Sequence, residues 1–345
     1  MFIERCFQLA RMGSGNVAPN PMVGAVVVVD NKIIGEGYHK QIGSWHAEVN
    51  AINSVEDKSL LKKATVYVSL EPCSHFGKTP PCAKLLVDSQ IKRCVIANFD
   101  PNPKVSGRGI QMLKDAGIEI TCGVEEKQGR FLNRRFFCFQ EKHRPYVILK
   151  FAQTLDGFMD IDRSNGNKQY WITNDAMKVF VHKMRKDNDA FFVGANTIIN
   201  DNCKLNVRYF CGNNPIRVTY DKNLSLDKPK NFFDDSQKTI VFNDKLQQYV
   251  GENTHYIKIS NNEEFIPQML GNLYDNGISS LVVEGGKKTL DKFLQLGLWD
   301  EAIVITGNTK FGKGIKSPVI DTLLKASTSW VSDNRIDFFV NNNAF

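Results

Sequence analysis

The sequence has no long apolar run, no long block of basic residues and no internal repeat. Crossing a bilayer as a helix takes roughly 18 or more apolar residues, so we expect no membrane span. The first residues, "MFIERCFQLARMGSG", carry charge inside a helical apolar pattern, which differs from a signal peptide. These absences favour a cytoplasmic protein. The formal net charge of +7 is spread along the chain and suits phosphorylated small molecules as well as nucleic acid.

A second expected absence is that of disulfide bonds. Without an export signal, the eight cysteines should remain reduced thiols. Only Cys73 and Cys82 lie in a loop rich in proline and glycine, "EPCSHFGKTPPC" (71–82), and this setting favours a metal site. The other six stand singly among apolar residues and are predicted to be small core residues: Cys6, Cys94, Cys122, Cys138, Cys203 and Cys211.

The length of 345 residues, with 42% hydrophobic residues, predicts two domains. In the first, strands and helices alternate, beginning with the β-branched run "VGAVVVVD" (23–30), so we expect an α/β domain with a largely parallel sheet. An aromatic and basic passage (131–145) ends at a proline. We therefore predict domains at residues 1–145 and 146–345, the second also α/β.

The motif "HAE" (46–48), which is predicted to open a helix, supplies a further metal ligand for the cysteine loop. His46, Cys73 and Cys82 supply one imidazole and two thiolates, the three-ligand set of a catalytic zinc site. Zinc lowers the pKa of a bound water towards ~7. Glu48 is two residues from His46 and is predicted to carry the proton of that water to a departing nitrogen, as in zinc deaminases.

Two other interpretations of this pattern stay open at this point. The residues could coincide by chance, or they could form a structural zinc site closed by His75. We favour catalysis because the motifs occur in order at a helix start, at a strand end and at the next helix start. The spacing also departs from the common Pro-Cys-x-x-Cys, since eight residues separate Cys73 from Cys82.

Several stretches together resemble one family: "NPMVGAVVV", "GEGYH", "HAEVNA", "LEPCSHFGKTPPC" and "DPNPKVSGRGI", followed by "RPYVILKFAQTLDG", "QYWIT" and "VEGG". They are similar to the bifunctional deaminase–reductases of riboflavin biosynthesis over essentially the whole chain. The resemblance implies a cytidine-deaminase-like zinc domain followed by a dihydrofolate-reductase-like domain. It also implies zinc-dependent deamination of a diamino-pyrimidinone ribosyl phosphate, then NADPH-dependent reduction of its ribosyl group to ribityl.

For the deaminase half, the resemblance implies three substrate contacts. Asn20 would hydrogen-bond the pyrimidine edge, while His75 and Lys78 would face the substrate, with Lys78 at its phosphate. Taken alone, a lysine in a glycine- and proline-rich loop is more typical of solvated surface.

For the reductase half, no GxGxxG follows a strand, which excludes the Rossmann fingerprint. Instead "VEGGKK" (283–288) places glycines between a strand and a helix, where backbone N–H groups can hold phosphate. The family has proline and a small residue at the two lysines, which here could meet the extra phosphate of NADPH. The implied cofactor contacts are Ala152, Trp171, Thr197, Asp201, Gly286, Lys287 and Lys288.

The resemblance also implies a set of substrate contacts in the reductase half: Lys150, Asp156, Gln169, Arg185, Leu205, Arg208 and Glu284. The two arginines would grip the substrate phosphate, and Lys150 and Asp156 are the candidate proton donors. "DNCKLNVR" (201–208) departs from the family's "DDPxLxxR" at its second and third residues. From the residues alone, Trp171 also fits a core aromatic, and Arg185 fits a charge on a helix face.

Two further functions compete with the two-site enzyme. One is a nucleic-acid or nucleotide deaminase with an accessory binding domain, although the sequence lacks an interleaved basic and aromatic surface pattern. The other is a zinc-stabilised interaction protein without turnover. For the leading hypothesis we expect a small phosphorylated pyrimidine as partner, no nucleic acid and no membrane. A homo-oligomer is also compatible with the sequence.

Overall fold

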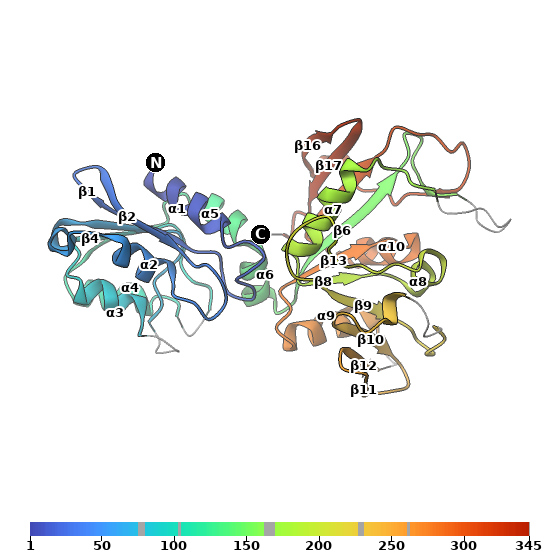
Figure 1. Cartoon of the computed structure of the whole chain (residues 1–345), viewed down its shortest axis with the longest axis horizontal. Coiled ribbons are helices and arrows are strands. Elements are labelled where there is room, and N and C mark those ends of the chain that lie inside the picture. The colour runs from blue at the N-terminus through green and yellow to red at the C-terminus, as the bar shows by residue number, and fades with distance from the viewer. Residues whose placement is uncertain (75–79, 103–104, 162–169, 227–230, 261–262, 345) are drawn as a thin grey trace. The chain divides into compact units, whose positions relative to one another are not determined.

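The structure is a computed structural model that describes the chain except for residues 75–79, 103–104, 162–169, 227–230, 261–262 and 345. The chain forms two units, Met1–His143 and Arg144–Phe345 (Figure 1). Among the described helices, none has both the length and the apolar character that a bilayer crossing requires.

The first unit is built on a five-stranded sheet in the order β2-β1-β3-β4-β5. The predicted parallel arrangement holds only for β3, β4 and β5, since β1 runs antiparallel to both β2 and β3. A tight turn at Asp30 and Asn31, both with positive φ, joins β1 directly to β2 and leaves no room for a crossover helix. The elements are α1 (Phe2–Arg11), β1 (Gly24–Val29), β2 (Lys32–Tyr38), α2 (Ala47–Ser54), the short 3-10 helix Lys58–Lys63, β3 (Thr65–Val68), α3 (Cys82–Asp88), β4 (Arg93–Ile96), α4 (Arg108–Asp115), β5 (Glu119–Cys122), α5 (Glu126–Leu132) and α6 (Arg134–Lys142).

Helices cover both faces of this sheet, which explains the unbroken valine run of β1. Successive side chains of a strand point to opposite faces. Val26 and Val28 pack with residues of α1, whereas Val27 packs with residues of α2, α3 and α4. Figure 1 shows α1 and α5 on one side of the sheet and α2, α3 and α4 on the other.

The glycines of "GEGYH" let α2 approach β2 closely. A Cβ added to Gly37 would stand 2.4 Å from the backbone nitrogen of Ala51 in α2, so no side chain fits there. This close approach sets how near α2 lies to β2, and with it the position of His46, the residue that precedes the first turn of α2.

The second unit contains a ten-stranded sheet in the order β11-β12-β10-β9-β8-β13-β6-β14-β17-β16, parallel from β12 to β14. A small two-stranded sheet pairs β7 with β15. The strands are β6 (Tyr146–Gln153), β7 (Phe158–Asp160), β8 (Ala190–Phe192), β9 (Ile216–Tyr220), β10 (Thr239–Asn243), β11 (Gln248–Val250), β12 (Thr254–Lys258), β13 (Ser280–Glu284), β14 (Glu301–Thr306), β15 (Ile315–Lys316), β16 (Lys325–Val331) and β17 (Asn334–Val340). The helices are α7 (Ala176–Asp187), α8 (Ala195–Asp201), α9 (Phe265–Asp275) and α10 (Lys287–Leu296), with 3-10 turns at Asn231–Phe233 and Thr322–Leu324.

The two faces of the large sheet differ in chemistry near its centre. Leu149 and Val283 point into one apolar cluster together with residues of α9 and α10. Because side chains alternate, the next residues along these strands, Lys150 and Glu284, point to the opposite face. That face is the one that α7 approaches, since its Arg185 reaches Glu284.

The cysteine predictions were partly right. None of the eight cysteines forms a disulfide. Cys6, Cys94 and Cys138 are buried as predicted, while Cys122 and Cys203 are half-buried. The prediction for Cys211 is wrong: it is exposed, in a loop whose apolar residues Tyr209 and Phe210 are themselves exposed. Apolar neighbours in the sequence do not bury a thiol when the whole segment lies outside the sheet.

Candidate active sites

The three predicted metal ligands come together in the first unit. The Nδ1 atom of His46 lies 3.5 Å from Sγ of Cys73 and 3.3 Å from Sγ of Cys82. All three ligand atoms lie within 4.8 Å of one another. As predicted, His46 stands at the start of α2, Cys73 follows β3, and Cys82 opens α3.

This donor set fits a tetrahedral zinc ion. With Zn–S near 2.3 Å and Zn–N near 2.0–2.1 Å, tetrahedral ligands would have sulfur and nitrogen about 3.6 Å apart. The observed separations of 3.5 and 3.3 Å are close to this. Hydrogen bonds from Cys82 and from His46 lower the pKa of Cys73, and the contact with Cys73 raises the pKa of His46 to about 8. A thiol that ionises readily beside an imidazole suits a cation that takes the place of protons.

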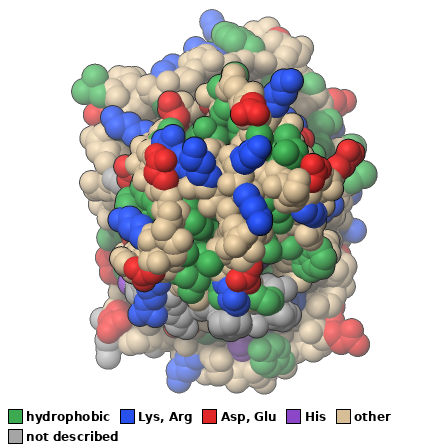
Figure 2. Space-filling view, turned by 90° about the vertical axis from the view of Figure 1, so that its left-hand side faces the viewer, with side chains coloured by type: hydrophobic (Ala, Val, Ile, Leu, Met, Phe, Trp, Pro, Cys, Tyr) green, Lys and Arg blue, Asp and Glu red, His purple; other side chains and the backbone are tan. Residues whose placement is uncertain are grey.

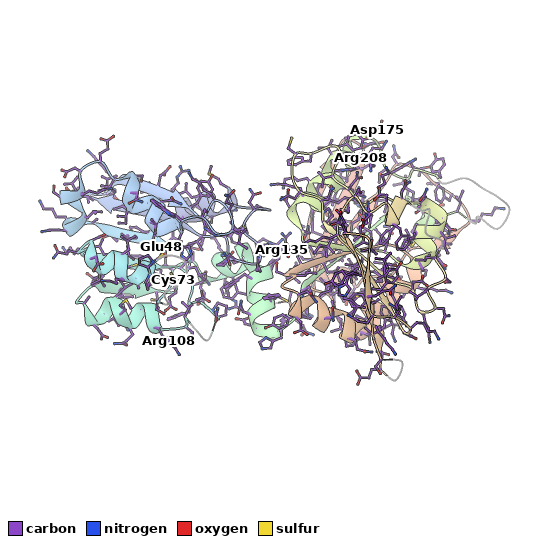
Figure 3. All side chains as sticks on the ribbon, turned by 60° about the horizontal axis from the view of Figure 1, so that its bottom comes forward. Glu48, Cys73, Arg108, Arg135, Asp175 and Arg208 are labelled. Carbon is purple, nitrogen blue, oxygen red and sulfur yellow. The ribbon has the colours of Figure 1, made fainter. Side chains whose placement is uncertain are left out.

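Glu48 is buried next to this cluster. Its residue is 3% exposed, in the first turn of α2. Burial and the neighbouring Cys73 raise the pKa of Glu48 to about 7. Glu48 and Cys73 lie beside each other in Figure 3. A carboxyl group with a pKa near neutrality can both accept and return a proton, which is the property a general acid–base residue needs.

A buried histidine links Asn20 to the zinc-site region. Nδ2 of Asn20 lies 3.5 Å from Nε2 of His39, and the rings of His39 and His46 meet edge to face at 5.5 Å. The other ring nitrogen of His39 bonds the carbonyl of Trp45 at 3.1 Å. The exposed Asn20 is therefore placed near the cluster, as expected of a substrate contact. The other two expected contacts, His75 and Lys78, lie outside the described residues.

A second group of charged residues forms at the carboxyl end of β13. Glu284 pairs with Lys150 of β6 at 3.2 Å and with Arg185 of α7 at 3.5 Å. All three side chains are at least 85% buried. Although burial alone would raise it, the charges of Lys150 and Arg185 lower the pKa of Glu284. Arg185 is therefore more than a charge on a solvated helix face.

The loop after α8 brings Arg208 to the same region. Its backbone N–H donates to Nδ1 of His182, three residues before Arg185 on α7, at 2.8 Å. The Arg208 guanidinium is exposed and bonds Asn206. Leu205 is only 2% exposed, so it supports this loop from inside and does not present a surface. The last predicted substrate contact, Gln169, lies outside the described residues.

Asp156 has a different environment from the one expected of a proton donor. Its carboxylate accepts hydrogen bonds from Thr154 at 2.5 Å, from the backbone of Phe311 at 3.2 Å and from that of Gly312 at 2.7 Å. The bond from Thr154, helped by these backbone groups, lowers the pKa of Asp156 to about 2. An acid of this strength is ionised at neutral pH, so the structure favours Lys150 over Asp156 as the donor.

The candidate cofactor residues fall into two groups. Gly286 has a φ of 67° and precedes α10, and the hydroxyls of Thr197 and Thr289 each lie 3.6 Å from where its Cβ would be. Lys287 pairs with Asp291 at 2.5 Å, whereas Lys288 is exposed. The remaining candidates lie on other elements: Ala152 in β6, Asp201 at the end of α8, and Trp171 before α7. Trp171 is 63% exposed, and its ring centroid lies 5.0 Å from Nζ of Lys178.

Trp171 is thus not a core aromatic, the alternative that its residue type suggested. Its exposed ring, held by a cation–π contact, is available to a ligand.

The surface charge of the first unit is mixed. On the face shown in Figure 2, lysine and arginine side chains are interspersed with acidic and apolar ones. In the part of this face that the structure describes, they form no single continuous basic patch. This arrangement gives no support to an extended nucleic-acid track.

Comparisons with known proteins agree with this arrangement of two sites. A family profile described as "RibD C-terminal domain" matches residues 145–334, and one described as "Cytidine and deoxycytidylate deaminase zinc-binding region" matches residues 1–98. The riboflavin biosynthesis protein RibD of Aquifex aeolicus is 38% identical over 320 residues, covering 91% of this chain and 88% of its own. The chain belongs to the RibD family. Its members are bifunctional deaminase–reductases of riboflavin biosynthesis, and the predicted family, enzyme class and fold are confirmed.

Other relatives in the RibD family cover nearly the whole chain. RibD of Bacillus amyloliquefaciens is 40% identical over 87% of this chain and 82% of its own. A solved Thermotoga maritima protein, a diaminohydroxyphosphoribosylaminopyrimidine deaminase and 5-amino-6-(5-phosphoribosylamino)uracil reductase, has a TM-score of 0.88 at 36% identity, covering 99% of this chain and 97% of its own. Acinetobacter baumannii RibD follows with a TM-score of 0.87 at 31% identity, covering 99% and 98%. The matching architecture therefore includes both units.

Sequence reasoning missed two histidines beside these sites. His39 stands in "GEGYH", which is part of the family resemblance, but nothing in its spacing shows that it reaches Asn20. His182 lies three residues before Arg185 on α7, so helical spacing placed it on the same face. In both cases the signal was a histidine near a predicted site residue, which is too common to use alone.

Proposed function

We propose that the first unit deaminates a diamino-pyrimidinone ribosyl phosphate and that the second reduces the deaminated product with NADPH. The observation that supports the first step most strongly is the His46, Cys73 and Cys82 cluster with Glu48 buried beside it. In functional terms we assign residues 1–143 to the deaminase and 144–345 to the reductase, a boundary two residues before the one expected from the sequence.

In the deaminase site, zinc held by His46, Cys73 and Cys82 would supply an activated water when bound. The chain's own residues perform the other tasks. Glu48, with its raised pKa, takes a proton and returns it to the leaving nitrogen. Asn20 binds the pyrimidine edge, with its amide held by His39. From the family resemblance we also assign His75 and Lys78 to the substrate, with Lys78 at its phosphate.

In the reductase site, Arg185 and Arg208 bind the phosphate of the substrate, and Glu284 and Lys150 lie beside its sugar. Lys150 is the proton donor that the geometry favours, because Asp156 is fixed as an acceptor by Thr154, Phe311 and Gly312. From the family resemblance we also assign Asp156, Gln169 and Leu205 to the substrate.

For the cofactor we propose NADPH. The turn before α10 presents Gly286 and the Thr197 hydroxyl to its phosphates. Lys288 is the better candidate for the extra phosphate, because Lys287 is already paired with Asp291. The other contacts that we assign to the cofactor are Ala152, Trp171 and Asp201.

We further propose that the protein acts in the cytoplasm on small molecules, and that nucleic acid and membranes are not its partners. The absence of disulfides among its eight cysteines is compatible with a reducing compartment. A homo-oligomer remains a prediction from the sequence.

The test is a direct comparison of substrates on the zinc-loaded chain. We expect ammonium release from the diamino-pyrimidinone ribosyl phosphate and none from RNA. We then expect loss of NADPH absorbance with the deaminated product, and slower loss of NADH. Ammonium release from RNA would instead indicate a nucleic-acid deaminase. One bound zinc per chain without any turnover would indicate an interaction protein.

A further inference from the structure

His182 lies between the two arginines that we assign to the phosphate of the reductase substrate. It is 3% exposed on α7. The backbone N–H of Arg208 donates to its Nδ1 at 2.8 Å, and Nη1 of Arg185 lies 3.3 Å from its Nε2. Its ring also meets that of Tyr209 edge to face, with the centroids 4.8 Å apart. One imidazole therefore contacts both arginines and the residue that follows the second.

The contact with Arg208 decides which ring nitrogen carries the proton. A backbone N–H can only donate, so Nδ1 must accept and carries no proton. A neutral imidazole then has its proton on Nε2. The ring therefore presents an N–H to the Arg185 guanidinium, which also has only N–H groups to offer. These two donors cannot bond each other.

The ring also stays uncharged at neutral pH. Burial, together with the charges of Arg185 and Arg208, lowers the pKa of His182 to about 4, although Glu284 acts in the opposite direction. Tyr209 is the other titratable group in contact with the ring. At neutral pH, His182 therefore presents its Nε2–H to Arg185.

Arg185 consequently keeps donors that the protein does not use. Its Nη1 donates to the carbonyl of Asn206 at 3.1 Å, and its Nη2 lies 3.5 Å from Glu284. Its Nε is buried and has no hydrogen-bond partner among the described residues. A buried guanidinium N–H without an acceptor is costly, and an anionic oxygen would satisfy it.

We propose that His182 is a positioning residue of the reductase phosphate site: its Nδ1 fixes the backbone of Arg208, and its Nε2–H leaves the remaining donors of Arg185 to an anion. This inference rests on the proposed function, because it takes Arg185 and Arg208 as the phosphate-binding pair. It adds a residue that holds both arginines in place without forming part of the reacting centre.

Two substitutions test the hydrogen-bond acceptor of His182 and its ring separately. His182→Phe keeps the ring and its contact with Tyr209 but has no acceptor for the Arg208 N–H. His182→Asn loses the ring but places an amide oxygen close to the position of Nδ1. For the full-length chain, we expect His182→Phe to raise KM for the phosphorylated substrate on the order of ten-fold, the scale of one orphaned buried donor. KM for NADPH and kcat should change little, and inhibition by inorganic phosphate should weaken in parallel with the rise in KM. His182→Asn should restore KM to near the wild-type value.

A spectroscopic measurement tests the same point on the unmodified protein. In nitrogen NMR of the chain with labelled histidines, the His182 signals, assigned by their loss in His182→Asn, should show a bare Nδ1 and a protonated Nε2 at neutral pH. This readout stays decisive if His182→Phe fails to fold.

Three outcomes would overturn the inference: a wild-type KM in His182→Phe, an equal rise of KM in both variants, or a proton on Nδ1. A wild-type KM in His182→Phe together with a raised KM in His182→Asn would mean that the ring acts only by packing. Arg208→Ala separates this inference from the proposed function. If that variant leaves KM for the phosphorylated substrate unchanged, the phosphate assignment fails. If it raises KM while His182→Phe does not, only the role of His182 fails.

Discussion

Glu71 joins the loop of Cys73, a proposed zinc ligand, to the start of α4, and its replacement should destabilise the first unit. The residue is 4% exposed. One carboxylate oxygen accepts from the backbone N–H groups of Asp100 at 3.3 Å and Gly107 at 3.1 Å. The other accepts from those of Gly109 at 3.1 Å and Ile110 at 3.3 Å, in the first turn of α4, where N–H groups have no partner within the helix.

The change Glu71→Gln keeps the shape and removes half of these acceptors. The amide oxygen can serve one pair of N–H groups, but the amide nitrogen then faces the other pair, donor against donor. Two buried donors lose their acceptor, at about 1–3 kcal/mol each, so we expect a loss of about 2–6 kcal/mol. This is a large part of the roughly 5–15 kcal/mol that stabilises a typical domain.

The measurement is the unfolding free energy from native-state hydrogen exchange of peptides covering β4 and α4. Glu56→Gln, at an exposed position of the same unit, is the matched control and should stay within about 0.5 kcal/mol of wild type. Reductase activity should be unaffected in both variants, because Glu71 contacts only the first unit in these bonds. A Glu71→Gln protein as stable as the control would refute the reasoning.

Three further predictions concern the two sites and their separation. Cys82→Ser should lose the bound zinc, measured as metal per chain, and with it deamination, while NADPH binding is retained; one equivalent of zinc in this variant would show that the ligand set is wrong. Glu48→Gln should keep zinc and lower the deamination rate by ~10²-fold or more, the scale of general acid–base catalysis, and a rate near wild type would exclude Glu48 as the proton carrier. A fragment of residues 144–345 should fold and oxidise NADPH with the deaminated substrate, whereas one starting at residue 146 should be less stable, by up to about 3–5 kcal/mol. The reason is that Arg144 holds the buried Asp300 carboxylate through two bonds of 2.6 and 2.7 Å, and equal melting temperatures of the two fragments would contradict it.

Residue chemistry and local spacing were enough to predict the deaminase centre. His46 and Cys82 open helices and Cys73 follows a strand, and each of these positions can be recognised from a few neighbouring residues. The continuous valine run of β1 likewise predicted a strand buried on both faces, because an apolar side chain at every position requires cover on each side.

Strand direction and side-chain partners depended on contacts between distant residues. The run 23–30 carries no sign that β1 lies antiparallel to β3, since the same residues suit either direction. The sequence placed Asp156 in a substrate segment, but only its bonds to residues 311 and 312 make it a permanent acceptor.

The sequence by itself determined the family and the order of the two catalytic halves, and it predicted the zinc ligands, because these depend on residue types at short spacing. Only the tertiary structure decided that Asp156 accepts from Phe311 and Gly312, that Arg144 belongs with the second unit, and that His182 meets the backbone N–H of Arg208. A side chain with several possible partners is committed to one of them by the packing of elements that lie far apart in the chain, and local patterns carry no record of that packing.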